Sequence, residues 1–434
     1  MAWDFETDPE YQAKLDWAAD FVRDEVEPLD FAVDGLDIHN PLWQELVLPL
    51  QEKVKAQGLW ATHLGPELGG PGHGQVKLAL LNEILGRGGL GPIVFGCAAP
   101  DTGNMEILAH YGTPEQKEKW MNPLLAGKIL SAYAMTEPQG GADPTALQTT
   151  AVVDGEDWVI NGEKWFISNA AEADFLIMFV VTDPDNPPHK RASMLIVPTD
   201  TPGLETVRNI GMRLRGNRDA SESYLRLTNA RVPRANLLGD RGQAFAIAQT
   251  RLGGGRVHHA MRTLGNVSRA FDMLCERAIS RTTKGELLAD KQMIQSMISE
   301  SWIEMEQFRL LVLRTAWRID RYQDYKRVRG DIAAVKVAMP KVLNNIASRA
   351  LQIHGSLGVT TEMPFIDMIV SSYTMGLADG PTEVHKVTLA KKILRDYEPS
   401  DDLFPTRHIP KLREKAHARY ADVFARHGID APVY

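Results

Sequence analysis

The stretch that decides the fold class is TAVVDGEDWVINGEKWFISN, residues 150–169. Within it, Val152–Val159 and Lys164–Ser168 have the composition of short strands. Asp154-Gly155 and Asn161-Gly162 interrupt these segments, and both dipeptides are typical of β-hairpin turns. The stretch therefore predicts antiparallel β structure in the middle of the chain.

More strand-like segments follow. Phe175–Val181 and Ser193–Val197 are apolar runs of strand length, and apolar and polar side chains alternate over residues 224–228. We therefore expect a small β domain over residues 131–238.

Helical spacing flanks this β region on both sides. Apolar side chains at spacings of three and four predict a helix near the N-terminus and two long helices after Gly239, of the kind that pack into bundles. The three sets are Tyr11, Leu15, Ala18, Val22 and Val26; Ile298, Trp302, Met305, Phe308, Val312, Thr315 and Ile319; and Ile332, Val335, Met339, Val342, Ile346 and Ile353. The predicted class is α+β, with helical domains over residues 1–130 and 239–398 and a tail over 399–434.

The composition favours a soluble protein. The chain has 434 residues and a net charge of −8, which argues against a nucleic-acid-binding surface with clustered Lys and Arg. Its two cysteines exclude a disulfide framework and a paired-cysteine zinc site. The first residues, MAWDFETDPE, lack the apolar core of a signal peptide, and no apolar run approaches the ~20 residues of a membrane-spanning helix. We expect a cytoplasmic protein with no membrane span and no nucleic-acid partner.

Four motifs occur in order along the chain. They are YAMTEP followed by GGAD (133–138 and 140–143), NGEKWFISN (161–169), QIHGSLG (352–358) and ADGPTEVH (378–385). Together they resemble the acyl-CoA dehydrogenase family of flavoenzymes, over residues 10–398. RLGGGRVHH (251–259) and the ending of the fourth motif are similar to the subgroup containing family members 10 and 11. The resemblance implies an all-α N-terminal domain, a middle β-barrel and a C-terminal four-helix bundle.

The resemblance also implies a FAD site. In the family the first motif borders the flavin, the second supplies an aromatic face and a hydroxyl, and the third reaches the FAD of the neighbouring subunit. The implied cofactor-binding residues are Tyr133, Met135, Thr136, Gly141, Ala142, Phe166, Ile167, Ser168, Arg281, Gln292, Gln352, Gly355, Ser356, Pro381 and Glu383. A shared site implies a homodimer or a homotetramer. Taken alone, the first motif is more typical of an ordinary strand and turn. The third motif is also a common glycine-capped helix end, and both interpretations of it can hold together.

Asp379 is the candidate catalytic base. The family removes the α-proton of an acyl-CoA thioester with a carboxylate while the β-hydride leaves to flavin N5, and Asp379 matches the position of that carboxylate. The family's second location for the base is Thr250 in this sequence, which carries no carboxylate. The alternative is a turn residue, because Asp-Gly-Pro is a strong turn sequence. The resemblance further implies substrate contacts from Ala142, Arg251 and Gly380, with Arg251 orienting the Asp379 loop.

Other features have competing interpretations. Strand alternation points Trp165 away from Phe166, into the core. Gly253–Gly255 lies in a helical segment, where each glycine costs roughly 1 kcal/mol, so either helices or an acyl chain approach closely there. His258 and His259 have no Cys or carboxylate cluster beside them in the sequence, so no metal site is predicted. His385 is expected to be structural or adjacent to the cofactor.

The leading functional hypothesis is a FAD-dependent acyl-CoA dehydrogenase of fatty-acid β-oxidation that passes electrons to an electron-transfer flavoprotein, as the resemblance implies. Two alternatives stay open. A flavin oxidase of the same fold, such as a nitroalkane oxidase, also uses an Asp base, and differs in the oxygen reactivity of its reduced flavin. A non-catalytic acyl-binding protein would be colourless when purified.

Overall fold

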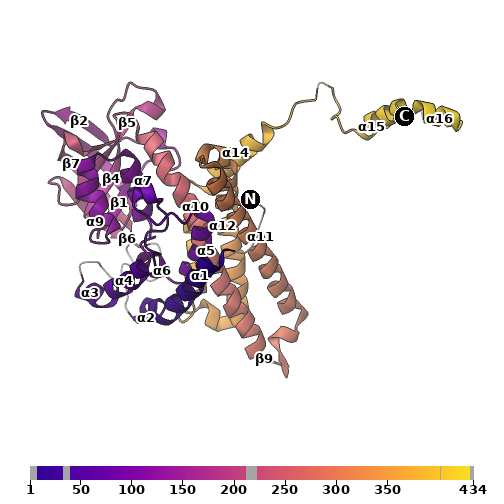
Figure 1. The fold of residues 1–434 in the computed structure, drawn as a ribbon, viewed down its shortest axis with the longest axis horizontal. Coiled ribbons are helices and arrows are strands. Elements are labelled where there is room, and N and C mark those ends of the chain that lie inside the picture. The colour runs from indigo at the N-terminus through magenta and orange to yellow at the C-terminus, as the bar shows by residue number, and fades with distance from the viewer. Residues whose placement is uncertain (1–6, 33–39, 212–221, 401, 431–434) are drawn as a thin grey trace. The chain divides into compact units, whose positions relative to one another are not determined.

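The computed structural model describes residues 7–32, 40–211, 222–400 and 402–430. The chain divides into two compact units, Met1–Val387 and Thr388–Tyr434. Within the first unit, short helices come first, a β sheet follows, and long helices come last (Figure 1). This order confirms the predicted α+β class, with a sheet domain between two helical regions. The domain boundaries at residues 130, 238 and 398 stay a prediction.

The N-terminal region is helical, as its spacing predicts. Asp8 caps the first helix by accepting a hydrogen bond from the Tyr11 amide, and Thr113 and Gln116 form a capping box at a later one. The predicted stripe of Tyr11, Leu15, Ala18, Val22 and Val26 is buried. The α-helices are α1 (Pro9–Phe21), α2 (Leu29–Ala32), α3 (Pro41–Leu46), α4 (Leu48–Ala56), α5 (Gln75–Leu85), α6 (Gly91–Val94), α7 (Asp101–Tyr111), α8 (Pro114–Gln116) and α9 (Asn122–Leu125).

The middle region forms one eight-stranded sheet with the order β6-β7-β3-β2-β4-β5-β8, and β1 pairs with β4 in parallel. The strands are β1 (Ser131–Ala134), β2 (Thr150–Asp154), β3 (Asp157–Ser168), β4 (Phe175–Val181), β5 (Ala192–Pro198), β6 (Leu204–Ile210), β7 (Glu222–Pro233) and β8 (Leu237–Leu238). The predicted turn at Asp154-Gly155 is confirmed, because Asp154 pairs with Asp157 in the β2–β3 hairpin. All of β4 is buried, which fits its unbroken apolar sequence.

The second predicted hairpin, at Asn161-Gly162, is wrong. β3 continues through both residues, and its register against β7 shifts between Ile160 and Gly162. Gly162 has a φ of +145°, and a Cβ there would lie 2.6 Å from Thr149 Oγ1. The extra residue of this bulge is on β7, and Gly162 lets Thr149 approach β3 closely instead of forming a turn.

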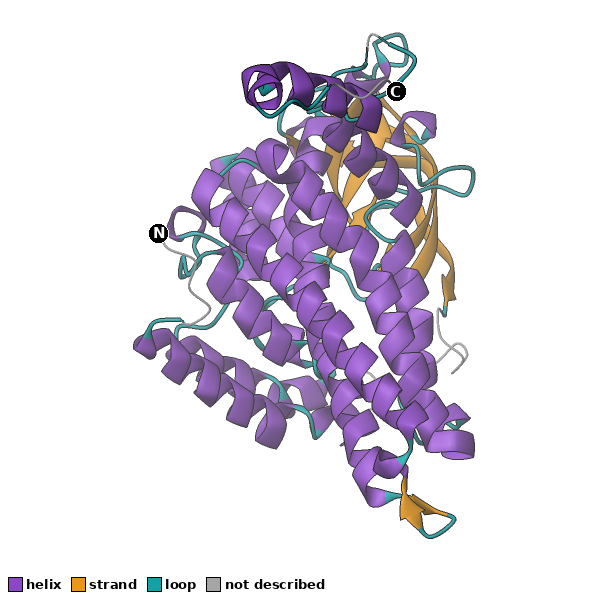
Figure 2. Cartoon of the chain, turned by 90° about the vertical axis from the view of Figure 1, so that its right-hand side faces the viewer, coloured by secondary structure: helices purple, strands orange, loops and turns teal. Residues whose placement is uncertain are grey.

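The C-terminal region of the first unit is a helical bundle whose long helices pack side by side (Figure 2). Its helices are α10 (Ala244–Ser280), α11 (Gln292–Tyr322), α12 (Tyr325–His354) and α13 (Phe365–Leu377), and a small hairpin of β9 (Thr282–Thr283) and β10 (Glu286–Leu287) joins α10 to α11. The predicted stripe on α12 is buried throughout. On α11, however, the side chain of Trp302 is 53% exposed, so this member of the predicted stripe is wrong.

After the bundle, α14 (Thr382–Leu394) crosses from the first unit into the second, which also contains α15 (Ile409–Arg419) and α16 (Ala421–Arg426). None of the helices in the described ranges is long and apolar enough to cross a bilayer.

Candidate active site

Asp379 lies in a tight turn between α13 and α14. Asp379 has a φ of +55° and Gly380 a φ of +99°, so two successive residues adopt the left-handed region. Glycine enters this region freely, and Asp tolerates it better than most side chains. The Asp379 side chain is only 15% exposed. The turn sequence and the candidate base are therefore compatible, because the turn itself presents a largely buried carboxylate.

Basic side chains from two helices contact Asp379. Arg256 Nε donates a hydrogen bond of 2.9 Å to the Asp379 carbonyl oxygen, and His385 Nε2 lies 3.2 Å from the same oxygen. His259 Nε2 lies 3.5 Å from Asp379 Oδ2. The backbone and the carboxylate of the candidate base therefore have separate basic neighbours.

This environment keeps the carboxylate ionised. Burial alone would raise the pKa of Asp379, but His259, Arg251, Arg256 and Lys336 outweigh it, and the pKa lies below its ordinary value. Burial lowers the pKa of His259 to about 4, so the imidazole is neutral at pH 7 and the standing positive charge is that of the two arginines and the lysine. The candidate base is therefore ready to accept a proton at neutral pH.

Arg251 connects α10 to α7 and to β1, and none of its described hydrogen bonds goes to the Asp379 turn. Its Nε donates to Asn104 Oδ1 at 2.9 Å, and its guanidinium lies 3.9 Å from the centroid of the Tyr133 ring on β1. The Tyr133 hydroxyl is buried and has no partner among the described residues. The expected loop-orienting contact is made instead by Arg256, while the expected substrate contact of Arg251 stays a prediction.

The glycine run in α10 is filled by side chains. A Cβ on Gly253 would lie 3.3 Å from the ring of Tyr325, one on Gly254 would lie 3.0 Å from Glu106 Oε2, and one on Gly255 would lie 3.1 Å from Asp379 Oδ2. Burial raises the pKa of Glu106 to about 8, so this carboxyl is mostly protonated at pH 7. The absent side chains thus let polar groups approach α10 beside the candidate base.

The other predicted base position is occupied by a hydrogen-bonded hydroxyl. Thr250 Oγ1 lies 2.8 Å from the Tyr111 hydroxyl. His258 of α10 is buried, and its Nε2 has no hydrogen-bond partner within the described ranges. No group of three His, Cys, Asp or Glu side chains in those ranges could hold a metal ion.

The first two motifs meet where β1 ends. Thr136 Oγ1 donates to the Trp165 carbonyl at 2.6 Å, and the Trp165 amide donates to the Thr136 carbonyl at 3.1 Å. A Cβ on Gly141 would lie 3.4 Å from Thr136 Cγ2, so the GGAD turn, with exposed Ala142, borders Thr136. Lys164 Nζ donates to the Met135 carbonyl at 2.9 Å. The structure thus brings Met135, Thr136 and Gly141 together beside β3.

The prediction that Trp165 points into the core, away from Phe166, is wrong. The β3–β7 register shifts between Lys164 and Ile167, and Phe166 has a φ of +55°. This bulge breaks strand alternation, so the two rings lie side by side with centroids 4.5 Å apart. Phe166 is 42% exposed and offers a flat apolar face.

The remaining side chains of the second motif, those of Ile167 and Ser168, already have partners within the sheet. The Ile167 side chain is buried in the sheet core, so only its backbone is open to a cofactor. Ser168 Oγ donates to Glu222 Oε2 at 2.8 Å. A phosphate that takes this hydroxyl would therefore have to displace a carboxylate.

The other predicted cofactor residues do not join this site in the same chain. Arg281, Gln292, Gln352, Gly355 and Ser356 are all exposed. Arg281 directly precedes β9, which lies at the end of the bundle away from the sheet (Figures 1 and 2). Pro381 and exposed Glu383 instead follow the Asp379 turn and open α14. Two groups of predicted residues are therefore separated within one chain.

Sequence reasoning missed several residues of the site. Arg256, Lys336 and Asn104 carried no prediction, and His259 was considered only as a metal ligand. His385 was expected to be structural or adjacent to the cofactor, and its contact with the Asp379 carbonyl oxygen agrees with a structural role. Arg256 and His259 lie in the RLGGGRVHH segment, so the signal was present: a buried helix face that carries Arg and His at a spacing of three. Lys336 and Asn104 sit within ordinary helical patterns, and only the packing reveals them.

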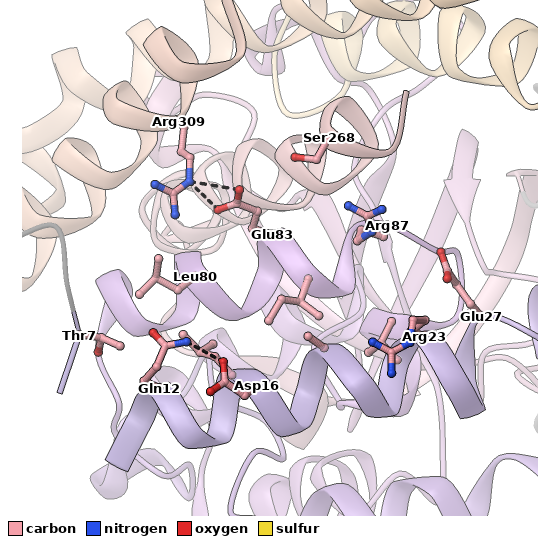
Figure 3. Close-up of a pocket in the computed structure, with 14 residues that line it drawn as sticks. Thr7, Gln12, Asp16, Arg23, Glu27, Leu80, Glu83, Arg87, Ser268 and Arg309 are labelled. Carbon is pink, nitrogen blue, oxygen red and sulfur yellow. Dashed lines mark hydrogen bonds and ion pairs between the residues drawn. The ribbon is translucent and has the colours of Figure 1, made fainter. Parts of the chain in front are cut away.

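A surface pocket of about 550 Å³ lies elsewhere, between α1, α5, α10 and α11 (Figure 3). Two pairs of its polar side chains bond to each other: Arg309 Nε lies 2.9 Å from Glu83 Oε2, and Gln12 Nε2 donates to Asp16 Oδ1 at 2.8 Å. No predicted site residue lines this pocket. The chemistry of the Asp379 region, not pocket size, therefore identifies the candidate active site.

Three family models match the chain in succession. They describe the N-terminal domain (residues 8–128), the middle domain (132–230) and the C-terminal domain (242–394) of acyl-CoA dehydrogenases. One similar solved structure is named "Structure of a putative acyl-CoA dehydrogenase from Mycobacterium abscessus". It is 35% identical, with a TM-score of 0.85, and the match covers 91% of this chain and all of that one.

Two relatives are similar in sequence. "Acyl-CoA dehydrogenase family member 11" of Rattus norvegicus is 39% identical over 352 residues, which are 80% of this chain and 45% of the rat protein. "Probable acyl-CoA dehydrogenase FadE2" of Mycobacterium tuberculosis is 40% identical over 353 residues, 80% of this chain and 85% of that protein. The chain thus spans about half the length of the rat relative and most of the mycobacterial one.

Proposed function

The chain belongs to the acyl-CoA dehydrogenase family, and we propose that it oxidises an acyl-CoA thioester to the 2-enoyl-CoA with Asp379 as the catalytic base. The single observation that carries this proposal is the largely buried Asp379 carboxylate in a left-handed turn, where basic side chains of α10 and α12 keep it ionised. A general base must be unprotonated and held in place before the substrate arrives, and both conditions are met.

FAD is the cofactor of the family, and the residues of this chain fit it. The buried Tyr133 hydroxyl lacks a partner in the described part of the chain, and Phe166 exposes an aromatic face. Thr136 uses its proton on the Trp165 carbonyl, but its oxygen can still accept a hydrogen bond from a flavin N–H. Met135, Thr136, Gly141, Ala142 and Phe166 would hold the flavin, which accepts the hydride from the β-carbon when bound.

The chain itself supplies the proton chemistry. Asp379 takes the α-proton, and the enolate that develops on the thioester oxygen needs hydrogen-bond donors. Among the described residues, no acceptor faces the Asp379 amide, so this N–H is available as one such donor. A water-excluding substrate would strengthen both interactions, because charge interactions gain strength in a low dielectric.

We further propose that the FAD site is completed by a second copy of the chain. The exposed Arg281, Gln292 and Gln352 match partner-facing positions of the family, and Arg281 directly precedes β9, at the end of the bundle away from the sheet. Exposed apolar side chains on the bundle, Trp302 of α11 and Tyr373 of α13, favour association of this region. An electron-transfer flavoprotein is the proposed electron acceptor, by the family resemblance.

The test is anaerobic bleaching of the flavin with a panel of acyl-CoA thioesters. Asp379→Asn should keep FAD and ligand binding and lose bleaching on the order of 10²–10⁴-fold, the usual contribution of a general base. Asp367→Asn, on α13 before the turn, is the matched control and should bleach like the wild type. Near wild-type bleaching by Asp379→Asn would exclude this residue as the base. Rapid reoxidation by oxygen would instead indicate a flavin oxidase.

A further inference from the structure

Three basic side chains from three helices hold the turn that carries Asp379. Arg256 of α10 and His385 of α14 both contact the Asp379 carbonyl oxygen, and Lys336 of α12 donates from Nζ to the Met375 carbonyl, near the end of α13. Lys336 is 1% exposed and His385 is 6% exposed. A non-glycine residue in the left-handed region is strained and persists only where its surroundings impose it.

We propose that Arg256 is the positioning residue of the catalytic base: its hydrogen bond fixes the Asp379 backbone, and its charge attracts the Asp379 carboxylate. This inference rests on the proposed function, since it assumes that Asp379 is the base. Arg256 acts through Asp379, whose carbonyl oxygen it contacts at 2.9 Å. The neighbouring Gly255 lets the carboxylate approach α10, because a Cβ there would lie 3.1 Å from Oδ2.

The charges around Asp379 decide what loss of Arg256 should do. The groups that face it are Arg251, Arg256, His259 and Arg262 of α10, Lys336 of α12, His385 of α14 and Tyr133 of β1. His259 and His385 have pKa values of about 4 because of burial, so neither replaces the lost charge at pH 7. Without Arg256, the pKa of Asp379 should rise towards its ordinary value.

Two variants distinguish the effect of the Arg256 hydrogen bond from the effect of the Arg256 charge. Arg256→Met keeps the length of the side chain and removes both the hydrogen bond and the charge. Its bleaching rate should fall about 10²-fold, the usual effect of a ~1 Å misplacement, and the acidic limb of the pH–rate profile should move to higher pH. Arg256→Lys keeps the charge but not the Nε–H, so its rate should fall while the acidic limb stays in place. Affinity for acyl-CoA should change little in both.

Arg269→Met is the matched control, because Arg269 also lies on α10 and also donates to a backbone carbonyl, that of Arg87 at 3.0 Å. It should leave the rate and the pH profile unchanged. A purely structural Arg256 would lower the rate of Arg256→Met without moving the acidic limb, and that result overturns the inference. If Arg256→Met fails to retain FAD, Arg256→Gln, which also removes the charge, takes its place: an acidic limb moved to higher pH supports the inference, and an unmoved limb overturns it.

Asp379→Asn, measured in parallel, distinguishes the two levels of the argument. If Asp379→Asn bleaches normally, the proposed function itself is wrong. If Asp379→Asn is inactive while Arg256→Met is fully active, only the positioning role of Arg256 is wrong.

Discussion

Replacing Lys164 with Met should loosen the flavin segment without disturbing the candidate base. Lys164 is 0% exposed and Glu137 is 2% exposed, and Lys164 Nζ lies 2.8 Å from Glu137 Oε1. The same ammonium donates to the Met135 carbonyl, so the buried pair ties the segment before Thr136 to β3. Met has nearly the length of Lys and no charge, so the variant leaves a buried carboxylate without its cation.

The size of the effect follows from the remaining donors. Removal of one partner of a buried ion pair costs about 3–5 kcal/mol. Glu137 keeps hydrogen bonds from the backbone amides of Gln148 at 2.6 Å and Thr149 at 2.9 Å. We therefore take the lower end, ~3 kcal/mol, which corresponds to about 10²-fold at ~1.4 kcal/mol per factor of ten.

The assay is native-state hydrogen exchange of peptides that cover residues 133–149. Amides in this segment should exchange about 10²-fold faster in Lys164→Met than in the wild type, and the double variant with Glu137→Gln should recover most of the loss because no buried charge remains. Lys336→Met is the matched control, since Lys336 is also buried but bonds to Met375. Unchanged exchange in Lys164→Met, or a double variant worse than the single one, would refute the reasoning.

Three further changes have expected outcomes. Gly255→Ala should raise the melting temperature, since Ala favours a helix by roughly 1 kcal/mol relative to Gly. It should also slow flavin bleaching several-fold, because the new Cβ would lie 3.1 Å from Asp379 Oδ2, and bleaching at the wild-type rate would contradict this. Arg281→Ala should release FAD and weaken self-association, as absorbance and size-exclusion chromatography would show; a fully loaded, stable monomer would count against it. Burial pushes the pKa of Glu137 up, but Lys164 and the amide donors hold it below 4.5, so its stabilisation is present at neutral pH and is lost as the pH falls through the folded-state pKa. An acid titration of FAD release should therefore show a transition below pH 4.5 that Glu137→Gln lacks.

The sequence predicted correctly those elements whose pattern of apolar residues is set by burial in the core of the same chain. The α12 stripe faces the bundle core along its whole length, and β4 is an unbroken apolar run buried on both faces, so period and length were sufficient. Trp302 is exposed although it belongs to the apolar stripe of α11. Periodicity shows which side chains share a helix face, but it does not show whether that face packs against the same chain or against another one. The exposure of Trp302 agrees with the proposed association of two copies.

The candidate site was only partly predictable. Asp379, Tyr133 and Thr136 were predicted because each lies in a short motif that can be recognised from the local sequence. Arg256, Lys336 and Asn104 lie far from these motifs along the chain, and their contacts depend on how α7, α10 and α12 pack. Asn161-Gly162 misled for the opposite reason, because a strong local turn signal was overridden by pairing with β7 on both sides of it.

The failures of local rules at Phe166 and Asp379 point to function. Phe166 is an aromatic residue at a φ of +55°, a conformation that a bulky side chain adopts only under constraint. Its neighbours supply the constraint, because Lys164 is fixed by the Glu137 pair and Ile167 is buried in the sheet core. Between these two anchors, the chain has one extra residue, and its ring is turned out beside Trp165. Asp379 is held in the same way by Arg256 and His385. Each strained residue is thus held by well-packed neighbours and presents one side chain. Phe166 presents an aromatic face at β3, which a flavin would need, and Asp379 presents a carboxylate before α14, which a thioester substrate would need.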